Sequence, residues 1–439
     1  MPFGFKGGIH PEYKKEYTSS KDIEELPSPD IAIIPLLQHI GTPCKPIVSV
    51  GDSVAVGQII GDSDAGMSCP VHASISGKVI AVEPRWHPSG VKVESVVIEN
   101  DGLDIHKPCI MPYYGNIQRI TPEEIIDYAR KAGIVGMGGA AFPLHVKLKS
   151  AIDAGVHTII VNGAECEPFI TSDHRAMLEY PRTIAGGVEL IMRCLGIESS
   201  VIAIEKNKPD AIASMTSACA DKNIEIIPLP TKYPQGGEKQ LVRAITGREI
   251  PPGKLPMDVG CIVLNVDSCA SLYRAIIKGV PLTKRVVTVS GPAVNTPKNL
   301  LVHIGTPFEK LFEYCDGFAE IPYKIIHGGP MMGSAQHNIE TPIVKNSSAL
   351  LAFCNDENET FPETQTCIRC GKCLEVCPMN LMPSMIYKSA LKGEFLKCKE
   401  MFVQDCIECG CCSYICPGKL YLVQAIRMAK CNLPKNANH

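Results

Sequence analysis

The sequence lacks long apolar runs, an apolar leader and a strong net charge. No apolar run approaches the roughly 18 residues that span a bilayer, and the stretch IAIIPLL (31–37) is interrupted by Pro35. The opening residues MPFGFKGGIHPEYKKEY have no apolar core of the kind found in signal peptides. A net charge of −3 gives no electrostatic case for nucleic acid or an anionic membrane surface. We therefore expect a soluble protein, or one that only its partners hold at a membrane.

Aromatic residues are also scarce, at 6% of the chain, but 45% hydrophobic and 20% charged residues are typical of a globular protein. A chain of 439 residues is too long for one compact core, so we expect three or four domains. Cysteine, in contrast, is abundant. The 21 cysteines do not indicate a secreted disulfide scaffold, because such scaffolds are short and loop-rich. They favour a reducing cytoplasm.

Changes in composition along the chain predict four domains. Residues 1–112 alternate short apolar runs with glycine and proline turns and predict a small β-domain. Residues 119–277 alternate strand and helix patterns, which indicates a parallel α/β layer. Residues 280–345 have the pattern strand, turn, strand and helix. A polar linker, 354–365, overlaps the start of a cysteine-rich domain, 355–432. The predicted fold class is therefore multidomain α/β and α+β.

Several elements of the predicted α/β layer are marked by their own residues. Thr121 and Glu124 predict a capping box at the start of a helix over 121–133. The apolar segments 157–165 and 200–207 predict buried strands.

Two similar cysteine motifs, CIRCGKCLEVCP and CIECGCCSYICP, begin at Cys367 and Cys406. Both have the spacing C-x2-C-x2-C-x3-C-P of bacterial ferredoxins, in which the fourth cysteine of each motif binds the other cluster. We therefore expect two [4Fe–4S] clusters. Their predicted ligands are Cys367, Cys370, Cys373 and Cys416 for one cluster and Cys377, Cys406, Cys409 and Cys412 for the other.

The other cysteines carry weaker signals. Cys411 lies inside the second motif but off its spacing. Structural zinc is the alternative for the two motifs, but a zinc site takes four ligands and needs no Cys-Pro fourth ligand. Cys69 and His72 resemble half of a metal site; no second pair lies nearby, so we interpret them as turn residues. The surplus cysteines are interpreted as buried thiols.

Two upstream segments favour a flavin or nucleotide site. AGIVGMGGAAFPLHVKL (132–148) carries four glycines, which allow a backbone to approach a planar or phosphorylated ligand closely. It is not the dinucleotide motif G-x-G-x-x-G, because Ala141 stands at the last position. VNGAECEPF (161–169) ends a predicted strand with two carboxylates, and ligands bind at strand ends in α/β sheets. An ordinary loop is the alternative for each segment.

Together these segments resemble the flavin- and NADH-binding subunit of respiratory complex I, whose motifs are GRGGAGFP, followed shortly by Lys, and N-A-D-E-x-E-P. The matching residues are Gly136, Gly138, Gly139, Phe142, Lys147, Asn162, Glu165, Glu167 and Pro168. Two shorter segments, YPQGGEKQL and LNVDS, resemble Y-x-x-G-E-E and N-N-V-E-T of that family. They contribute Tyr233, Gly236, Glu238 and Asn265.

The resemblance implies FMN held by the glycine loop, Lys147 and Asn265. It places NADH over the flavin, near Phe142, Glu165, Glu167 and Tyr233. No catalytic acid or base is expected, because hydride transfer between nicotinamide and flavin depends on stacking and orientation. Met137, Ala164 and Leu264 depart from the family's arginine, aspartate and asparagine.

The order of the parts resembles a narrower family, RnfC, from about residue 3 to residue 430. The resemblance is carried by FKGGIHPEYKKEYT (5–18), IIPLLQHIGTPCKPIVSVGDSV (33–54), the flavin region, HGGPMMG (327–333) and the cysteine motifs. It implies a barrel-sandwich-like domain, a Rossmann-like FMN/NADH domain, a β-grasp domain of the soluble-ligand-binding (SLBB) type and a ferredoxin-like domain.

It also implies a peripheral subunit at the cytoplasmic face of the cell membrane, with no direct membrane insertion. Its partners are then NAD(H), the membrane subunits and a ferredoxin-like subunit of a complex that couples ferredoxin and NAD redox to Na⁺ or H⁺ translocation.

Two alternatives stay open. A soluble flavin/iron–sulfur reductase of the cobalamin-reductase type shares the flavin loop and the clusters, but a leader of roughly 110 residues is not expected there. A cluster-only electron-transfer adaptor is favoured by the departures at Met137 and Ala164. The segment 327–333 is either a tight turn or part of a partner surface.

Overall fold

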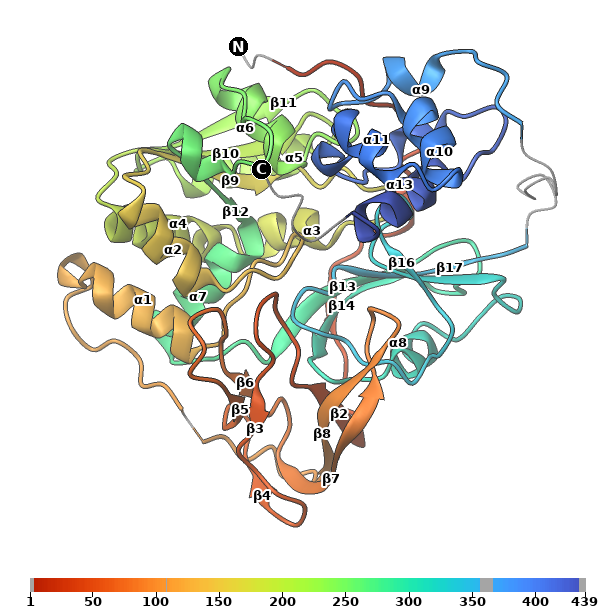
Figure 1. Cartoon of the computed structure of the whole chain (residues 1–439). Coiled ribbons are helices and arrows are strands. Elements are labelled where there is room, and N and C mark those ends of the chain that lie inside the picture. The colour runs from red at the N-terminus through yellow and green to blue at the C-terminus, as the bar shows by residue number, and fades with distance from the viewer. Residues whose placement is uncertain (1–3, 108, 356–365, 434–439) are drawn as a thin grey trace.

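The β-domain lies at the lower edge of the molecule in Figure 1. The computed structural model describes residues 4–107, 109–355 and 366–433. Two antiparallel sheets, ordered β2-β8-β7-β4 and β3-β5-β6, enclose a core that includes Ile34, Ile60 and Val79. Their strands are β2 (Ile31–Pro35), β3 (Lys45–Pro46), β4 (Ser53–Val54), β5 (Ile59–Asp62), β6 (Val71–His72), β7 (Gly77–Trp86) and β8 (Lys92–Asn100).

The predicted parallel α/β layer is confirmed as a four-stranded sheet ordered β11-β10-β9-β12, with every neighbouring pair parallel. Its strands are β9 (Thr158–Gly163), β10 (Ser200–Glu205), β11 (Ile224–Leu229) and β12 (Cys261–Asn265). The central strand β9 is apolar over 159–161, as a strand covered on both faces requires.

The helices of this layer begin and end where local signals place them. In α1, Thr121 Oγ1 accepts from the Glu124 N–H at 3.2 Å, and the Glu124 carboxylate accepts from the Thr121 N–H at 2.8 Å, which confirms the capping box. Gly196 and Gly279 end α4 and α7 in the left-handed conformation. The helices are η2 (Ile117–Arg119), α1 (Pro122–Lys131), α2 (Leu144–Asp153), α3 (Ser172–Glu179), α4 (Pro181–Leu195), α5 (Pro209–Ala218), α6 (Glu238–Thr246), η3 (Pro256–Val259) and α7 (Val266–Lys278).

The third unit contains a six-stranded mixed sheet ordered β1-β14-β13-β17-β15-β16. The strand, turn, strand and helix pattern appears as β13 (Lys284–Ser290), β14 (Lys298–His303) and α8 (Phe308–Tyr314), followed by β15 (Lys324–His327), β16 (Ser334–Gln336) and β17 (Ala349–Phe353). Because β17 lies between β13 and β15, this unit extends beyond residue 345. The predicted linker 354–365 lies largely outside the described residues.

The leading segment does not belong to the β-domain alone. After η1 (Lys15–Tyr17), strand β1 (Ile23–Glu25) pairs in parallel with β14 of the third unit. Gly8 and Ile9 contact the ferredoxin-like unit and the α/β layer, because the Gly8 N–H donates to the Val376 carbonyl and Ile9 exchanges hydrogen bonds with Tyr233. The segment therefore ties three units together.

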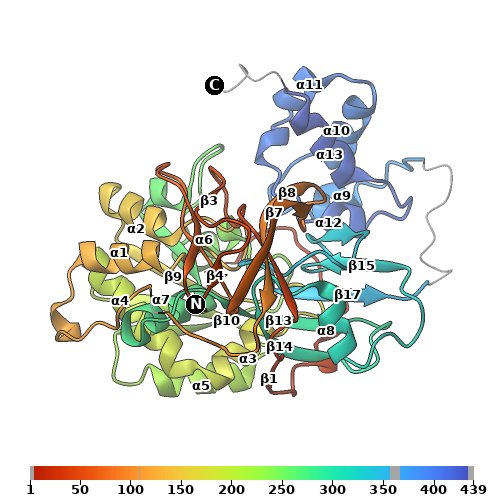
Figure 2. The same ribbon diagram turned by 90° about the horizontal axis from the view of Figure 1, so that it is seen from below.

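The ferredoxin-like unit projects from the rest of the molecule (Figure 2). Its helices are α9 (Lys372–Glu375), α10 (Pro383–Leu391), α11 (Phe395–Glu400), η5 (Val403–Asp405), α12 (Cys411–Tyr414) and α13 (Leu422–Cys431). The two motifs have the same backbone path, since Arg369 and Gly371 of the first and Glu408 and Gly410 of the second all have positive φ. The repetition in sequence is thus a repetition in structure.

Among the described residues, no helix is both long enough and apolar enough to cross a membrane.

Candidate flavin and iron–sulfur sites

The glycine-rich loop between α1 and α2, residues 135–143, is closed by an isolated antiparallel bridge at its ends. Within it the Gly136 N–H donates to the Phe142 carbonyl at 2.8 Å. The tip, residues 138–140, is exposed to solvent. The loop therefore presents backbone, with little side chain, on its outer side.

Met137 faces the interior from this loop. Its side chain is 1% exposed, and the Arg285 guanidinium donates to the Met137 carbonyl at 3.2 Å. Arg285 comes from β13 and pairs with buried Asp267 at 2.5 Å. Met137, which stands where the family has arginine, therefore lies on the side of the loop away from the exposed tip. Sequence analysis missed Arg285, because the pattern of its strand does not indicate that this arginine is buried against the glycine loop.

Two asparagines lie side by side at the carboxyl ends of β9 and β12, where Asn162 is in parallel register with Asn265. The Asn162 amide donates to the Gly236 carbonyl at 2.9 Å. A Cβ built on Gly138 would lie 3.2 Å from Asn265 Nδ2, so the loop rests directly on this asparagine. The strand ends thus bring the glycine loop and the Gly236 segment to one edge of the sheet.

A charged pair completes this edge. Lys147 Nζ of α2 lies 3.3 Å from Glu238 Oε1 of α6, and both side chains remain partly exposed. The contacts run in series through six predicted residues: Gly138, Asn265, Asn162, Gly236, Glu238 and Lys147. Gly136, Gly139 and the partly exposed Phe142 lie on the same loop. We call these six residues, with the loop, the loop edge.

Glu165 points inward. Its carboxylate accepts from the N–H groups of Asp173 and His174, at 2.8 and 3.3 Å, and from the Ser172 hydroxyl at 3.2 Å. It therefore binds the first turn of α3. Asp173 accepts from Asn265 Nδ2 at 2.7 Å, and burial together with Glu165 raises the pKa of Asp173 to about 7. Glu165 is thus linked to the loop edge through Asp173.

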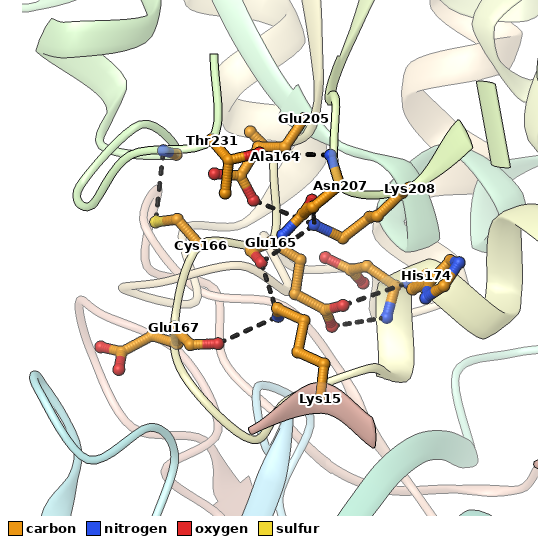
Figure 3. A network of polar contacts seen from close by, with 12 residues as sticks. Lys15, Ala164, Glu165, Cys166, Glu167, His174, Glu205, Asn207, Lys208 and Thr231 are labelled. Atoms are coloured by element: carbon orange, nitrogen blue, oxygen red, sulfur yellow. Dashed lines mark hydrogen bonds and ion pairs between the residues drawn. The ribbon is translucent and has the colours of Figure 1, made fainter. Parts of the chain in front are cut away.

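Lys15, from the leading segment, holds the backbone around Glu165 (Figure 3). Its ammonium group donates to the carbonyls of Glu165, Glu167 and Ile170 at 2.8, 3.0 and 2.6 Å. Burial and the neighbouring Lys208 lower the pKa of Lys15 to about 8. We call residues 165–170 the carboxylate loop.

Lys208 reaches the same loop from the turn that follows β10. Its Nζ lies 2.9 Å from Glu205 Oε2 and 3.3 Å from the Glu165 carbonyl, and both side chains of the Lys208–Glu205 pair are fully buried. Sequence analysis missed Lys15 and Lys208, because a lysine beside other charged residues usually lies on a solvated surface.

Glu167 points toward the segment 327–333. Its carboxylate accepts from the N–H groups of Met331 and Met332 at 3.1 and 3.0 Å. Burial raises the pKa of Glu167 to about 7, although these two N–H groups lower it. A Cβ built on Gly410 would lie 3.0 Å from the Met331 carbonyl oxygen. The segment is therefore a tight turn between the carboxylate loop and the second cysteine motif.

Tyr233 connects the flavin region directly to that motif. Its side chain is 1% exposed, and its hydroxyl donates to the Cys409 carbonyl at 2.8 Å. Ile9, Cys166 and Cys411 pack around it. In this structure Glu165, Glu167 and Tyr233 all bind protein groups, so their contact with NADH stays a prediction.

The ferredoxin-like unit contains two cavities, each lined by four motif cysteines. The inner cavity is lined by Cys377, Cys406, Cys409 and Cys412, together with Cys411. The outer cavity is lined by Cys367, Cys370, Cys373 and Cys416. Each set takes three cysteines from one motif and the fourth from the other. In the described part of the chain, no group of three or more His, Cys, Asp or Glu is placed to hold a single metal ion.

The inner cavity has donors suited to thiolate ligands. The Leu381 N–H donates to Cys377 Sγ at 3.3 Å, and the Glu408 N–H donates to Cys406 Sγ at 3.4 Å. The Cys411 thiol hydrogen-bonds to the Cys409 sulfur and lowers the pKa of Cys409. Hydrogen bonds of this kind stabilise the cysteine sulfurs that hold iron–sulfur clusters, so the residues present fit a [4Fe–4S] cluster.

The loop edge likewise fits a flavin phosphate and ring. It offers the Lys147 ammonium group and an open glycine backbone, and a Cβ built on Gly139 would meet no described atom within 4 Å beyond its chain neighbours. The Asn162 and Asn265 amides border the same edge and are bonded to Gly236 and Asp173. Ammonium and backbone N–H groups suit phosphate, and a glycine backbone without side chains leaves room for a planar ring.

Cys69 and His72 are buried, and the interpretation of His72 as a turn residue is wrong, because it lies in strand β6. The His72 imidazole lies 2.9 Å from the Lys131 carbonyl, and Cys69 is fully enclosed in the core. They join the β-domain to α1.

Comparison with known proteins matches four family models along the chain. They are the RnfC barrel sandwich hybrid domain (3–103), the Nuo51 FMN-binding domain (129–274), the SLBB domain (286–335) and the 4Fe-4S dicluster domain (361–417). The predicted fold class is thereby confirmed.

Two curated relatives align along almost the whole chain. The C subunit of the proton-translocating ferredoxin:NAD(+) oxidoreductase complex of Clostridium ljungdahlii is 48% identical over 428 residues, which are 97% of this chain and 93% of that protein. The C subunit of the Na(+)-translocating complex of Acetobacterium woodii is 46% identical over 427 residues, 97% of this chain and 96% of that protein.

Among solved structures, the NAD+-reducing [NiFe]-hydrogenase in its H2-reduced state shares the fold. The similarity has a TM-score of 0.51 at 14% identity and covers 74% of this chain and 65% of that one.

The fold and the two sites define an electron-transfer protein with an FMN-binding domain and a double [4Fe–4S] domain. The order of its domains and its identity to the curated relatives identify the family more narrowly. The chain belongs to the RnfC family, the C subunits of ion-translocating ferredoxin:NAD⁺ oxidoreductase complexes.

Proposed function

We propose that this subunit exchanges hydride between NAD(H) and FMN at the loop edge and passes single electrons through its two clusters. It works at the cytoplasmic face of the cell membrane, held there by the membrane subunits and a ferredoxin-like subunit of its complex. The complex couples ferredoxin and NAD redox to the translocation of Na⁺ or H⁺. Membership of the RnfC family supports this assignment.

FMN, when bound, supplies two-electron exchange with nicotinamide and one-electron exchange with clusters. The chain's own residues hold and orient it. Gly136, Gly138 and Gly139 expose loop backbone, and Lys147 provides positive charge for the phosphate. Asn162 and Asn265 hold the edge in place through their bonds to Gly236 and Asp173. The Gly236 carbonyl accepts from Asn162, and Glu238 pairs with Lys147, so these two residues hold the α6 side of the loop edge. For NAD(H) binding, the family resemblance assigns Phe142, Glu165, Glu167 and Tyr233; Phe142 lies partly exposed on the loop, and the other three bind protein groups in this structure.

The observation that carries the proposal is the hydrogen bond from the Tyr233 hydroxyl to the Cys409 carbonyl at 2.8 Å. It joins the flavin region to the loop around the inner cavity in one buried contact. We infer that the inner cavity holds the flavin-side cluster, with ligands Cys377, Cys406, Cys409 and Cys412. The outer cavity then holds the second cluster, with ligands Cys367, Cys370, Cys373 and Cys416.

The FMN assignment is tested by the flavin content of the purified protein. Lys147→Ala and Asn265→Ala are expected to lower bound FMN from about one per chain to a small fraction. The first removes the positive charge proposed for the phosphate, and the second removes the side chain on which Gly138 rests. The matched control is Lys149→Ala, an exposed lysine on the same helix α2. Equal FMN in all three variants would contradict the site. Circular dichroism before and after heating separates loss of flavin from loss of fold.

A further inference from the structure

The rim of the outer cavity is apolar and open. Ile368, Leu374 and Met385 line it, and their exposed fractions are 66%, 39% and 47%. Cys370, one of the four cysteines of this cavity, is itself exposed. A cluster in this cavity would therefore have one ligand, Cys370, at the protein surface, where an electron can enter or leave.

The same rim is positively charged. Arg369, Lys372 and Lys388 line the cavity, and no Asp or Glu is among its described lining residues. No salt bridge joins these three cations to any described residue of the chain. On the side of the inner cavity, by contrast, Glu408 is paired with Arg427 and Lys430. No described acidic side chain pairs with the three rim cations, so they are available to an acidic partner.

The positive charge is local to the rim. Residues 366–433 contain nine Lys and Arg against five Asp and Glu, but each oxidised [4Fe–4S] cluster with its four thiolates adds about −2, so the cluster-replete unit is close to neutral. Three of the nine cations gather at one cavity of the unit that projects from the molecule in Figure 2. A local group of charges of this kind steers an oppositely charged protein toward that surface.

We propose that this rim, the side chains of Ile368, Arg369, Lys372, Leu374, Met385 and Lys388, docks an acidic one-electron carrier protein. The proposal rests on the proposed function, because it uses the outer cluster as the exchange point. A small apolar centre with a charged surround fits the short-lived, weak complexes of electron-transfer proteins. One electron moves between carrier and cluster, so that one is oxidised as the other is reduced, and no bond forms or breaks.

The test uses the full, cluster-replete chain and a reduced acidic bacterial ferredoxin as the probe. Stopped-flow absorbance follows reduction of the clusters at low and high ionic strength. The triple variant R369Q/K372Q/K388Q is expected to react about tenfold or more slowly at low salt and to lose most of the salt dependence. The control K45Q/K78Q/K107Q changes three exposed lysines of the β-domain and leaves the same net charge. It is expected to stay within about twofold of wild type.

Three outcomes would overturn the proposal: an equal loss in rim variant and control, no loss in either, or selective loss of binding to anionic phospholipid vesicles with electron transfer unchanged. The last would assign the rim to a lipid surface instead. Lys388→Gln alone, on α10 outside the cysteine motif, repeats the test if the triple variant loses its cluster electron paramagnetic resonance signal. NADH bleaching of the flavin in the same samples reports on the proposed function separately, because it does not involve the rim.

Discussion

Lys15 is the residue through which the leading segment reaches the flavin region. Its ammonium group satisfies three carbonyls of the carboxylate loop, and Lys208 adds a fourth contact from the opposite side. A buried ammonium group is stable only when acceptors satisfy its N–H groups. Because the three acceptors here are loop carbonyls, Lys15 fixes the backbone of the carboxylate loop. The loop's two carboxylates are then directed to different elements, Glu165 to α3 and Glu167 to the turn at Met331.

Lys15→Met is expected to lower the free energy of unfolding by about 3 kcal/mol, because three buried carbonyls lose a charged donor. Urea unfolding followed by circular dichroism measures it, with the partly exposed Lys14→Met as the control.

The lowered pKa of Lys15 also makes the free energy of unfolding depend on pH. Between pH about 8 and about 10.5 the folded protein releases a proton that the unfolded chain keeps, so wild-type stability rises with pH relative to the variant. A difference that shrinks with pH would contradict this account.

The roles of Cys409 and Cys411 are expected to differ, although both line the inner cavity. Cys409→Ser removes a predicted ligand and should lower the iron content from about eight to about four atoms per chain. Cys411→Ser should keep about eight, because Cys411 lies off the ligand spacing and its thiol donates to the Tyr233 carbonyl at 4.0 Å. Iron analysis of anaerobically purified protein decides between them. Equal iron loss in both variants would make Cys411 a ligand.

At the scale of elements, the sequence was informative wherever the signal was local. The cysteine spacing, the Thr121 cap and the apolar strands of the parallel sheet each depend on residues a few positions apart, and each appears in the structure. Contacts between distant segments had no such signal. Nothing near Lys15 indicates the carboxylate loop, and nothing in β13 indicates that Arg285 reaches Met137. Likewise, only the sheet order reveals that β17 belongs between β13 and β15.

The glycine loop provides a test at this scale. Gly139 has no described atom within 4 Å of a Cβ built there, so Gly139→Val should leave the melting temperature unchanged. The added side chain would occupy the space above the loop, and FMN should bind at least about tenfold more weakly, roughly 1.4 kcal/mol. Fluorescence titration of flavin-free protein measures this. Gly66→Val, at an equally open glycine of the β-domain, should change neither property; unaltered FMN affinity in Gly139→Val would refute the placement.

At the scale of the whole molecule, one interface joins the flavin region to the clusters. The leading segment, the turn 327–333 and Tyr233 all meet the ferredoxin-like unit there, through Val376, Gly410 and Cys409. Three segments distant in sequence therefore position the inner cavity against the α/β layer. The outer cavity lies in the same unit, with its rim exposed.

Tyr233→Phe removes one hydroxyl from this interface and leaves the buried Cys409 carbonyl without its donor. The interface should weaken by about 1–3 kcal/mol, so that amide hydrogens of residues 405–412 exchange about tenfold or more faster. The matched control is Tyr128→Phe, which loses a hydroxyl bond to the Met111 carbonyl far from the cysteine motifs. Unchanged exchange in 405–412 would show that the hydroxyl does not hold the unit.

The central claim is a continuous path from NAD(H) through the loop edge to the two clusters. Anaerobic titration of the cluster-replete chain with NADH, following flavin and cluster absorbance together, tests it most directly. We predict that NADH bleaches both signals in the isolated subunit. Full clusters and bound FMN with no response of either signal to NADH would contradict the account.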